Sequence, residues 1–260
     1  LPNPRFAAVL DDGAKKPSFP RTGLGYLVKE FLGIHDLTDP YLYITDGGHW
    51  ENTGLVEILR SSAIREVVCV DADAGPGDAL SSLGKALELA PMECDVKIWI
   101  DLDCMRAKNA PSVHSPGYAD RTVNLGFFTR GRDVSTSGLV WYSKPGLTAA
   151  MPQHLLAFRE THADFPHVST VDQFFDTASF QAYRDLGRYN AREILFARSS
   201  LVALLADLSG MTDPEVIDSF LTGRAARPGA HWVIGEFHRA LGRRQEQDWG
   251  RFISTIAGVL

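Results

Sequence analysis

The sequence lacks a cluster of basic residues. Its 26 Lys and Arg are outnumbered by 32 Asp and Glu, which gives a formal net charge of −6. Proteins that bind nucleic acid neutralise phosphates with a basic face, and only short, isolated basic pairs occur here. We therefore expect no nucleic acid among the partners of this protein.

Cysteine is scarce, and long hydrophobic runs are missing. Cys69, Cys94 and Cys104 share no CxxC spacing, and two of them lie in or beside apolar runs, where free cysteine behaves as a small buried hydrophobe. This pattern favours a reducing compartment. No apolar run reaches the roughly 18 residues that span a bilayer, and no signal segment opens the chain. We expect the protein in the cytoplasm or at the cytoplasmic face of a membrane.

The chain has enough apolar residues for a large core. It is 260 residues long and 45% hydrophobic, which suits one large domain or one domain with an appendage. It opens at Leu1-Pro2 without an initiator Met. We therefore expect it to be a piece of a longer polypeptide.

Alternating apolar patterns predict an α/β fold. A short helix over residues 24–31, ended by Gly33, precedes a strand over 41–45, a helix over 52–62 and a strand over 66–70. Strand, helix and strand with short joints form a βαβ unit, and the nearly continuous apolar character of residues 66–70 is typical of a parallel sheet covered on both faces. The pattern repeats with a helix between Leu80 and Leu89 and a strand over 96–100.

The remaining sequence changes from strands to helices. Short strands are expected around residues 126–129 and 139–142, and helices over 151–160, 170–188 with an extension to about 205, 214–221 and twice between 232 and 260. We predict three layers, with a parallel sheet flanked by helices and followed by a helical C-terminal tail. The domain would cover residues 1–205 and the helical extension residues 206–260.

Asp46 is the main candidate for a functional residue. It directly follows the predicted strand over residues 41–45, and functional groups of parallel α/β sheets gather where strands end. Gly47 and Gly48 allow positive φ and a close approach of another group, and Asn52 is a candidate N-cap for the next helix. The same residues would also make an ordinary connector between a strand and a helix.

Two separate blocks resemble one family. Residues 45–55 (TDGGHWENTGL), with Glu57, Leu59-Arg60 and the strand into Asp71-Ala72, resemble the Asp-Gly-Gly segment of the patatin-like phospholipases, in particular the large bacterial members. The second block resembles a segment near the end of the same proteins and comprises residues 165–170 (FPHVST), 172–176 (DQFFD), Phe180 and 183–187 (YRDLG). The resemblance spans roughly residues 1–189, and nothing after Leu195 contributes to it.

The resemblance implies a serine acyl hydrolase. In that family a serine in a Gly-x-Ser-x-Gly elbow attacks an acyl ester, and the Asp of Asp-Gly-Gly completes a Ser-Asp dyad, so Asp46 takes the role of the Asp. A hydroxyl needs such a base within hydrogen-bond reach to become a good nucleophile. The implied substrate is a phospholipid or another acyl ester, with no cofactor and no metal. A peripheral contact with a membrane, or one made through an upstream segment, is compatible with this assignment.

The sequence departs from the family pattern in two respects. It contains no Gly-x-Ser-x-Gly and no glycine-rich oxyanion loop. In the family both lie upstream of Asp-Gly-Gly. We therefore expect an upstream segment of the same protein to supply the serine, and the present chain alone to be inactive.

Other polar groups leave alternatives open. His49 and Glu51 lie near Asp46, and we interpret them as structural or rim residues. The pairs Asp71/Asp73 and Asp101/Asp103 follow strands and would either bind a hard cation or cap the turns in which they lie. His162, Asp164 and His167 match no standard zinc spacing, so we expect a loop that is fixed onto the α/β layer.

Aromatic residues also have two interpretations. Phe174, Phe175, Phe180 and Tyr183 would be core residues or a lipid-binding stripe, and we favour the core. The aromatic residues after Trp232 would contact a membrane or pack on the domain or a partner, and we favour packing. Beside the hydrolase hypothesis stand a catalytically inactive patatin-like scaffold that binds partner proteins and, third, a metal-dependent enzyme that uses the two Asp pairs.

Overall fold

The computed structural model describes residues 23–34, 36, 39–41, 47–74, 80–108, 117–169, 172, 174–225 and 231–260. The chain divides into two compact units, Leu1–Trp50 and Glu51–Leu260. The described residues of the first unit include helix α2 (Leu24–Phe31) and the 3-10 turn η1 (Gly47–His49). Helix α2 has the predicted bounds, and Gly33 follows it with a left-handed φ of 64°. Asp46 and most of the predicted strand over residues 41–45 lie outside the described residues.

The second unit is built on a four-stranded mixed sheet. Its strands are β1 (Glu66–Val70), β2 (Val96–Trp99), β3 (Val123–Arg130) and β4 (Gly138–Ser143), in the order β1-β4-β3-β2. Strand β1 runs parallel to β4, whereas β3 is antiparallel to both of its neighbours. The α/β class is confirmed, but among the described strands β1 and β4 form the only parallel pair. The short link between β3 and β4, which holds the 3-10 turn η3 (Val134–Thr136), permits only an antiparallel hairpin.

A glycine is required where β4 begins. A Cβ on Gly138 would lie 2.2 Å from the carbonyl oxygen of Arg65 and 2.3 Å from the ring of Phe128. Phe128 is fully buried, so its ring has no room to move away. The close contact between β1, β3 and β4 therefore depends on a residue without a side chain.

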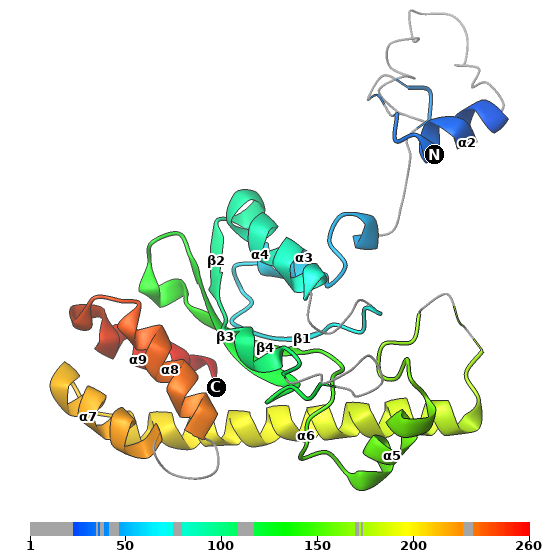
Figure 1. The fold of residues 1–260 in the computed structure, drawn as a ribbon. Coiled ribbons are helices and arrows are strands. Elements are labelled where there is room, and N and C mark those ends of the chain that lie inside the picture. The colour runs from blue at the N-terminus through cyan, green and yellow to red at the C-terminus, as the bar shows by residue number, and fades with distance from the viewer. Residues whose placement is uncertain are drawn as a thin grey trace, which may run out of the picture. The chain divides into compact units, whose positions relative to one another are not determined.

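One face of the sheet is covered by α3 (Leu55–Leu59) and α4 (Ser81–Cys94), shown above the sheet in Figure 1. Their apolar residues form one cluster with Val67 and Cys69 of β1 and Val140 and Tyr142 of β4. Helix α3 is shorter than the predicted helix over residues 52–62, and the predicted N-cap Asn52 is wrong. The helix follows Gly54, which has a left-handed φ of 69°.

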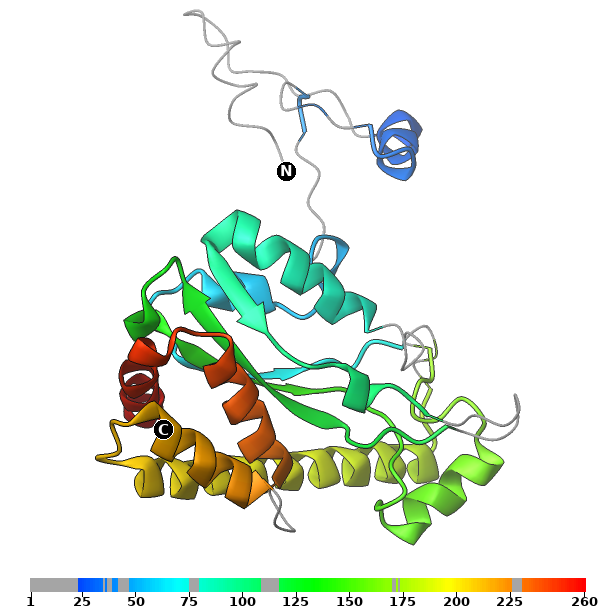
Figure 2. The same cartoon turned by 60° about the vertical axis from the view of Figure 1, so that its left-hand side comes forward.

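The opposite face is covered by the C-terminal helices. Helix α6 (Thr177–Leu208) runs along the sheet and is joined there by α8 (His231–Gly242) and α9 (Trp249–Val259), as Figures 1 and 2 show. Leu139 and Trp141 of β4 share a buried cluster with Leu201, Phe237 and Phe252. The terminal helices therefore pack on the sheet, as favoured from the sequence. Helix α7 (Pro214–Ala225) packs on α8, and the 3-10 turn η4 (Glu246–Asp248) leads into α9.

A third cluster lies beside the first half of α6. Helix α5 (Gln153–Thr161) follows β4 and packs against α6 through Leu155, Phe165 and Leu186. Strand β1 is an edge strand of the described sheet, and its Val68 and Val70 are 55% and 65% exposed. Among the described residues, no helix is long and apolar enough to cross a bilayer.

Candidate functional site

Polar residues gather at one edge of the sheet. Strands β1, β2 and β4 run in the same direction, because β3 is antiparallel to β4 and to β2. The carboxyl ends of these three strands therefore meet the first residues of β3. Asp71 follows β1, Asp101 follows β2 and Lys144 follows β4, and Thr122 precedes β3. Functional groups of α/β sheets commonly collect at such an edge.

Asp71 and Lys144 form the buried centre of this edge. Lys144 Nζ lies 3.3 Å from Asp71 Oδ1, and the two side chains are 4% and 2% exposed. Asp71 Oδ2 also accepts a hydrogen bond of 2.6 Å from the hydroxyl of Tyr142, and Lys144 donates one of 3.1 Å to the carbonyl of Asp73. Burial, with this hydrogen bond to Asp71, raises the pKa of Tyr142 far above its usual range. Tyr142 is therefore a neutral donor at physiological pH.

Both Asp-x-Asp pairs cap turns. The backbone N–H of Asp73 donates to Asp71 Oδ1 at 2.9 Å, and that of Asp103 donates to Asp101 Oδ1 at 3.1 Å. Asp73 further accepts a hydrogen bond of 2.7 Å from the hydroxyl of Ser82 at the start of α4. Within the part of the chain that the structure describes, no three His, Cys, Asp or Glu residues lie close enough together to hold a metal ion.

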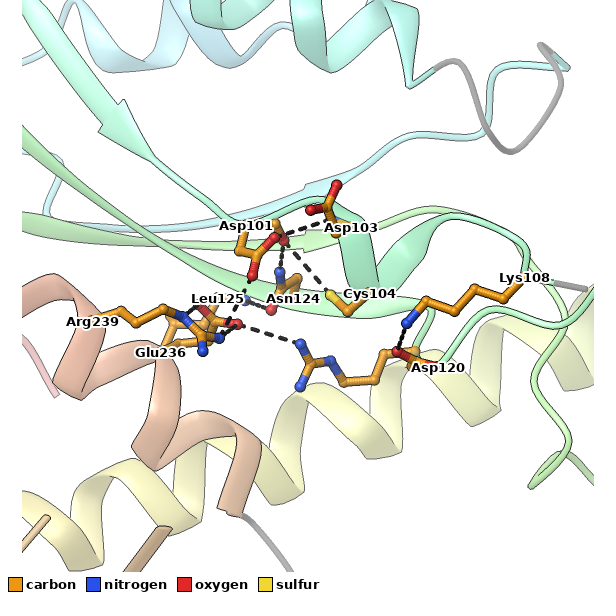
Figure 3. Close-up of polar contacts among 10 residues, drawn as sticks. Asp101, Asp103, Cys104, Lys108, Asp120, Asn124, Leu125, Glu236 and Arg239 are labelled. Carbon is orange, nitrogen blue, oxygen red and sulfur yellow. Dashed lines mark hydrogen bonds and ion pairs between the residues drawn. The ribbon is translucent and has the colours of Figure 1, made fainter. Parts of the chain in front are cut away.

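A second network lies where β2 ends and is shown in Figure 3. Glu236 of α8 is buried and accepts hydrogen bonds from Arg121 at 3.3 Å and from Arg239. Burial raises the pKa of Glu236, while the two arginines oppose the shift. The buried side chain of Asn124 donates to the carbonyl of Asp101 and so fixes the loop after β2 on β3. This network ties α8 to the same sheet edge.

A cavity of about 400 Å³ opens at this edge. Its wall includes Arg121 before β3, Lys144 after β4 and Arg159 of α5. The volume lies in the range of ordinary small-ligand sites. The wall also combines these charged residues with apolar ones, among them Leu80, Met105, Leu147 and Phe165. The cavity is therefore suited to a ligand with a polar and an apolar part.

The second block of the family resemblance contributes to the cavity wall. Phe165, Pro166 and His167, the first residues of that block, all line it. The ring of Phe165 packs edge-on against the rings of Phe158 and Tyr183 at 5.1 Å, and the N–H of Val168 donates to the hydroxyl of Tyr183. The loop is thus fixed onto α5 and α6.

The other predicted site residues have different environments. His49 belongs to the first unit and is exposed, whereas Glu51 is 4% exposed and accepts backbone hydrogen bonds from Thr53 and Val56. Glu51 thus fixes the start of α3. The favoured core role of the aromatic stripe is wrong for Phe174, Phe175 and Phe180, which are 95%, 48% and 60% exposed. Residues 170, 171 and 173 lie outside the described part of the chain.

The described cysteines are poor nucleophiles. Burial raises the pKa of Cys69 to about 11, and burial also raises the pKa of Cys104. A thiol with a raised pKa is almost fully protonated near neutral pH and reacts slowly. Neither thiol is therefore suited to act as a nucleophile.

Sequence reasoning did not find Lys144 or Arg121. Lys144 is the residue directly after the buried strand β4, and a charged residue in that position followed by proline was the available signal. Arg121 follows a segment rich in glycine, proline and serine, and no pattern distinguishes it from a surface arginine.

Comparison with known proteins yields no relative. The sequence matches no family model, and neither a curated protein nor a solved structure shows significant similarity to it.

Proposed function

We propose that this chain is part of a serine acyl-ester hydrolase of the patatin-like type, in which Asp46 is the aspartate of a Ser-Asp dyad. An upstream segment of the same protein supplies the serine. The substrate is a phospholipid or another acyl ester, and the reaction uses no cofactor or metal.

The cavity at the sheet edge carries the proposal. The resemblance to this family depends on two blocks of sequence more than a hundred residues apart. Pro166 and His167 of the second block line the cavity, and the continuation of the first block ends at Asp71, which holds the wall residue Lys144. The second block thus supplies wall residues, and the first block supports the wall from behind through Asp71, which does not itself line the cavity. Two blocks that resemble one family and contribute to the same sheet edge support a common binding function better than either block alone.

The chemistry needs one base and one hydroxyl. Asp46 removes the proton of the serine hydroxyl while its oxygen attacks the ester carbonyl. The ester C–O bond breaks, and the leaving alkoxide receives the proton from Asp46. Water then attacks the acyl-serine with Asp46 again as base, which releases the fatty acid and restores the serine.

The decisive experiment changes Asp46 in a polypeptide extended upstream to include the serine elbow. Asp46→Asn should reduce hydrolysis of p-nitrophenyl butyrate by at least about a thousandfold, because the base is lost. Asp218→Asn, which removes an exposed carboxylate on α7 from its pair with His238, is the control and should keep full activity. Circular dichroism must show that both variants are folded. An Asp46→Asn protein that is folded and fully active would refute the assignment.

The second candidate is a catalytically inactive scaffold that binds a partner protein. It is favoured by the exposed apolar side chains along the outer side of α6, where Leu195 is 63% and Phe196 57% exposed. Large apolar side chains that lie exposed next to each other on one helix are typical of an interaction surface. The two candidates differ in the upstream sequence, since an extension without Gly-x-Ser-x-Gly would favour the scaffold.

A further inference from the structure

We propose that the cavity at the sheet edge binds a phosphate group, of the kind carried by a phospholipid head group or by a small phosphate ester. The link to a phospholipid substrate rests on the proposed function. Phosphate binding itself needs no turnover and is measured separately.

Cationic side chains reach the cavity from three separate elements. Arg121 precedes β3, Lys144 follows β4 and Arg159 belongs to α5. A phosphate group has several oxygens in a tetrahedral arrangement, so it can accept hydrogen bonds from several directions at once. A carboxylate has two oxygens in one plane and matches donors from three elements less well.

The counter-charges of two of these cations lie outside the wall. Lys144 pairs with Asp71, and Arg121 pairs with Glu236, but neither carboxylate lines the cavity. Asp164 is the single acidic residue among the described wall residues. The carboxylates thus hold these two cations in place without lining the cavity themselves.

The cations are fixed in position before a ligand binds. Lys144 forms an ion pair with Asp71 and donates a hydrogen bond to the carbonyl of Asp73. Its ammonium has three protons, and these two contacts use two of them, so the third remains for a ligand. The guanidinium of Arg121 lies 4.6 Å from the centre of the Trp232 ring, which adds a cation–π contact.

Arg159 is fixed in a different way. It donates to the carbonyls of His162 and Ala163 just after α5. The buried Nε of Arg121 and that of Arg159 have no hydrogen-bond partner among the described residues. A buried donor without a partner costs free energy, and a bound phosphate would supply the missing acceptor after a small shift of the side chain.

The apolar part of the wall indicates what the phosphate is attached to. Met105, Leu147 and Phe165 line the same cavity as the three cations. A head-group phosphate next to glycerol and the first carbons of an acyl chain would use both kinds of surface. This arrangement deepens the proposed function by assigning the cavity to the head-group side of a phospholipid.

The first test measures binding of glycerol 3-phosphate to the full 260-residue chain by titration calorimetry or ³¹P NMR. Arg121→Gln and Arg159→Gln should each weaken binding by about tenfold or more, as expected for the loss of a charge-assisted hydrogen bond. Arg224→Gln removes the same charge from α7, where Arg224 pairs with Asp207 of α6, and should leave the dissociation constant unchanged. Binding should also weaken as the salt concentration rises.

Asp164→Asn provides a test with the opposite sign. It removes the acidic side chain from the described wall, so binding of glycerol 3-phosphate should become several-fold tighter. A purely structural role of these residues would not produce one change that weakens and another that strengthens binding. If Arg121→Gln fails to fold, Arg121→Lys keeps the charge and should retain measurable binding, while Arg159→Gln and Asp164→Asn still decide the question.

The second test identifies the source of the phosphate. Vesicles that contain phosphatidylglycerol should compete with glycerol 3-phosphate if the ligand is a lipid head group. Failure to compete would assign the site to a free phosphate ester. Asp46→Asn should keep glycerol 3-phosphate binding whether or not it abolishes hydrolysis, so the two proposals fail separately. Absence of binding, or binding that none of the wall variants changes, would overturn the inference.

Discussion

Lys144 and Asp71 form an ion pair with a separation of 3.3 Å in which both side chains are almost completely shielded from water. The pair joins the ends of the two parallel strands β1 and β4, and Tyr142 adds a third buried polar group to it. A buried charge is tolerated only when it has such partners. These buried polar contacts therefore hold the sheet edge in a fixed arrangement next to the cavity.

The first prediction concerns this ion pair. Lys144→Met should lower the free energy of unfolding by about 3–5 kcal/mol, because it leaves the carboxylate of Asp71 buried with no cation. Urea denaturation measures the change. The double variant Lys144→Met with Asp71→Leu should recover a large part of the loss, since it removes both charges. A single variant as stable as the wild type would show that the two groups do not act as a buried pair.

The second prediction concerns the start of β4. Gly138→Ala should destabilise the protein by about 1–3 kcal/mol or more, because the new methyl group would overlap the carbonyl of Arg65 and the buried ring of Phe128. Gly84→Ala is the matched control, since a Cβ at Gly84 in α4 meets no other atom within 4 Å. That change should stabilise the helix by about 0.5–1 kcal/mol. Thermal melts of the two variants should shift in opposite directions.

The third prediction concerns the first turn of α6. Asp176 Oδ1 accepts a hydrogen bond of 2.7 Å from the N–H of Ser179, and this bond lowers the pKa of Asp176. Because the pKa is lower in the folded state, the cap stabilises the protein above the unfolded-state pKa of about 4 and is lost as the pH falls through the folded-state value. Asp176→Ala should therefore lower the Tm at pH 7.

The same experiment at lower pH provides the control. The Tm difference between wild type and Asp176→Ala should shrink as the pH is lowered from 7 toward 3. Asp176→Asn keeps an uncharged capping oxygen, so its Tm difference from Asp176→Ala should change little with pH. A wild-type advantage over alanine that stays constant down to pH 3 would contradict a role for the ionised carboxylate.

The fourth prediction concerns thiol reactivity. Burial raises the pKa of Cys69 to about 11 and also raises the pKa of Cys94, but Cys94 is only partly buried and so remains accessible to reagent. Iodoacetamide at pH 8 should therefore alkylate Cys94 first and label Cys69 only in denaturant. Mass spectrometry of tryptic peptides follows the order. Rapid alkylation of native Cys69 would mean that the cluster between α3, α4 and the sheet opens readily.

The sequence predicts the bounds of a strand well where apolar residues form a short block between polar residues, but not its burial, since Val68 and Val70 of β1 are exposed at the sheet edge. The strand over residues 66–70 has the predicted bounds because its apolar run has sharp limits on both sides. The sheet is nevertheless mixed, since pairing direction depends on the length of the connection between strands rather than on the strands themselves. The N-cap was misassigned because Asn52 and Gly54 are both good helix-start residues, and only the backbone angle of Gly54 distinguishes them.

The candidate site was harder to predict for a physical reason. Its cations Arg121, Lys144 and Arg159 come from three different elements and share no sequence motif, and only the fold brings them to one cavity. The exposure of Phe174 and Phe180 also depends on where α6 begins, because the apolar periodicity of the segment does not show which side faces the sheet. The role of Asp46 stays a prediction, since that residue lies outside the described part of the chain.

The long helix α6 has a consequence for biosynthesis. Glu66 at the start of β1 binds Arg198 near the far end of α6, and Trp141 donates to the same carboxylate. The face of the sheet that α6 covers also needs Phe237 of α8 and Phe252 of α9 to exclude water. A ribosome makes these helices after all four strands, so one apolar face of the nascent sheet stays uncovered until they have emerged. Synthesis of this protein should accordingly depend on chaperones that shield unfinished chains.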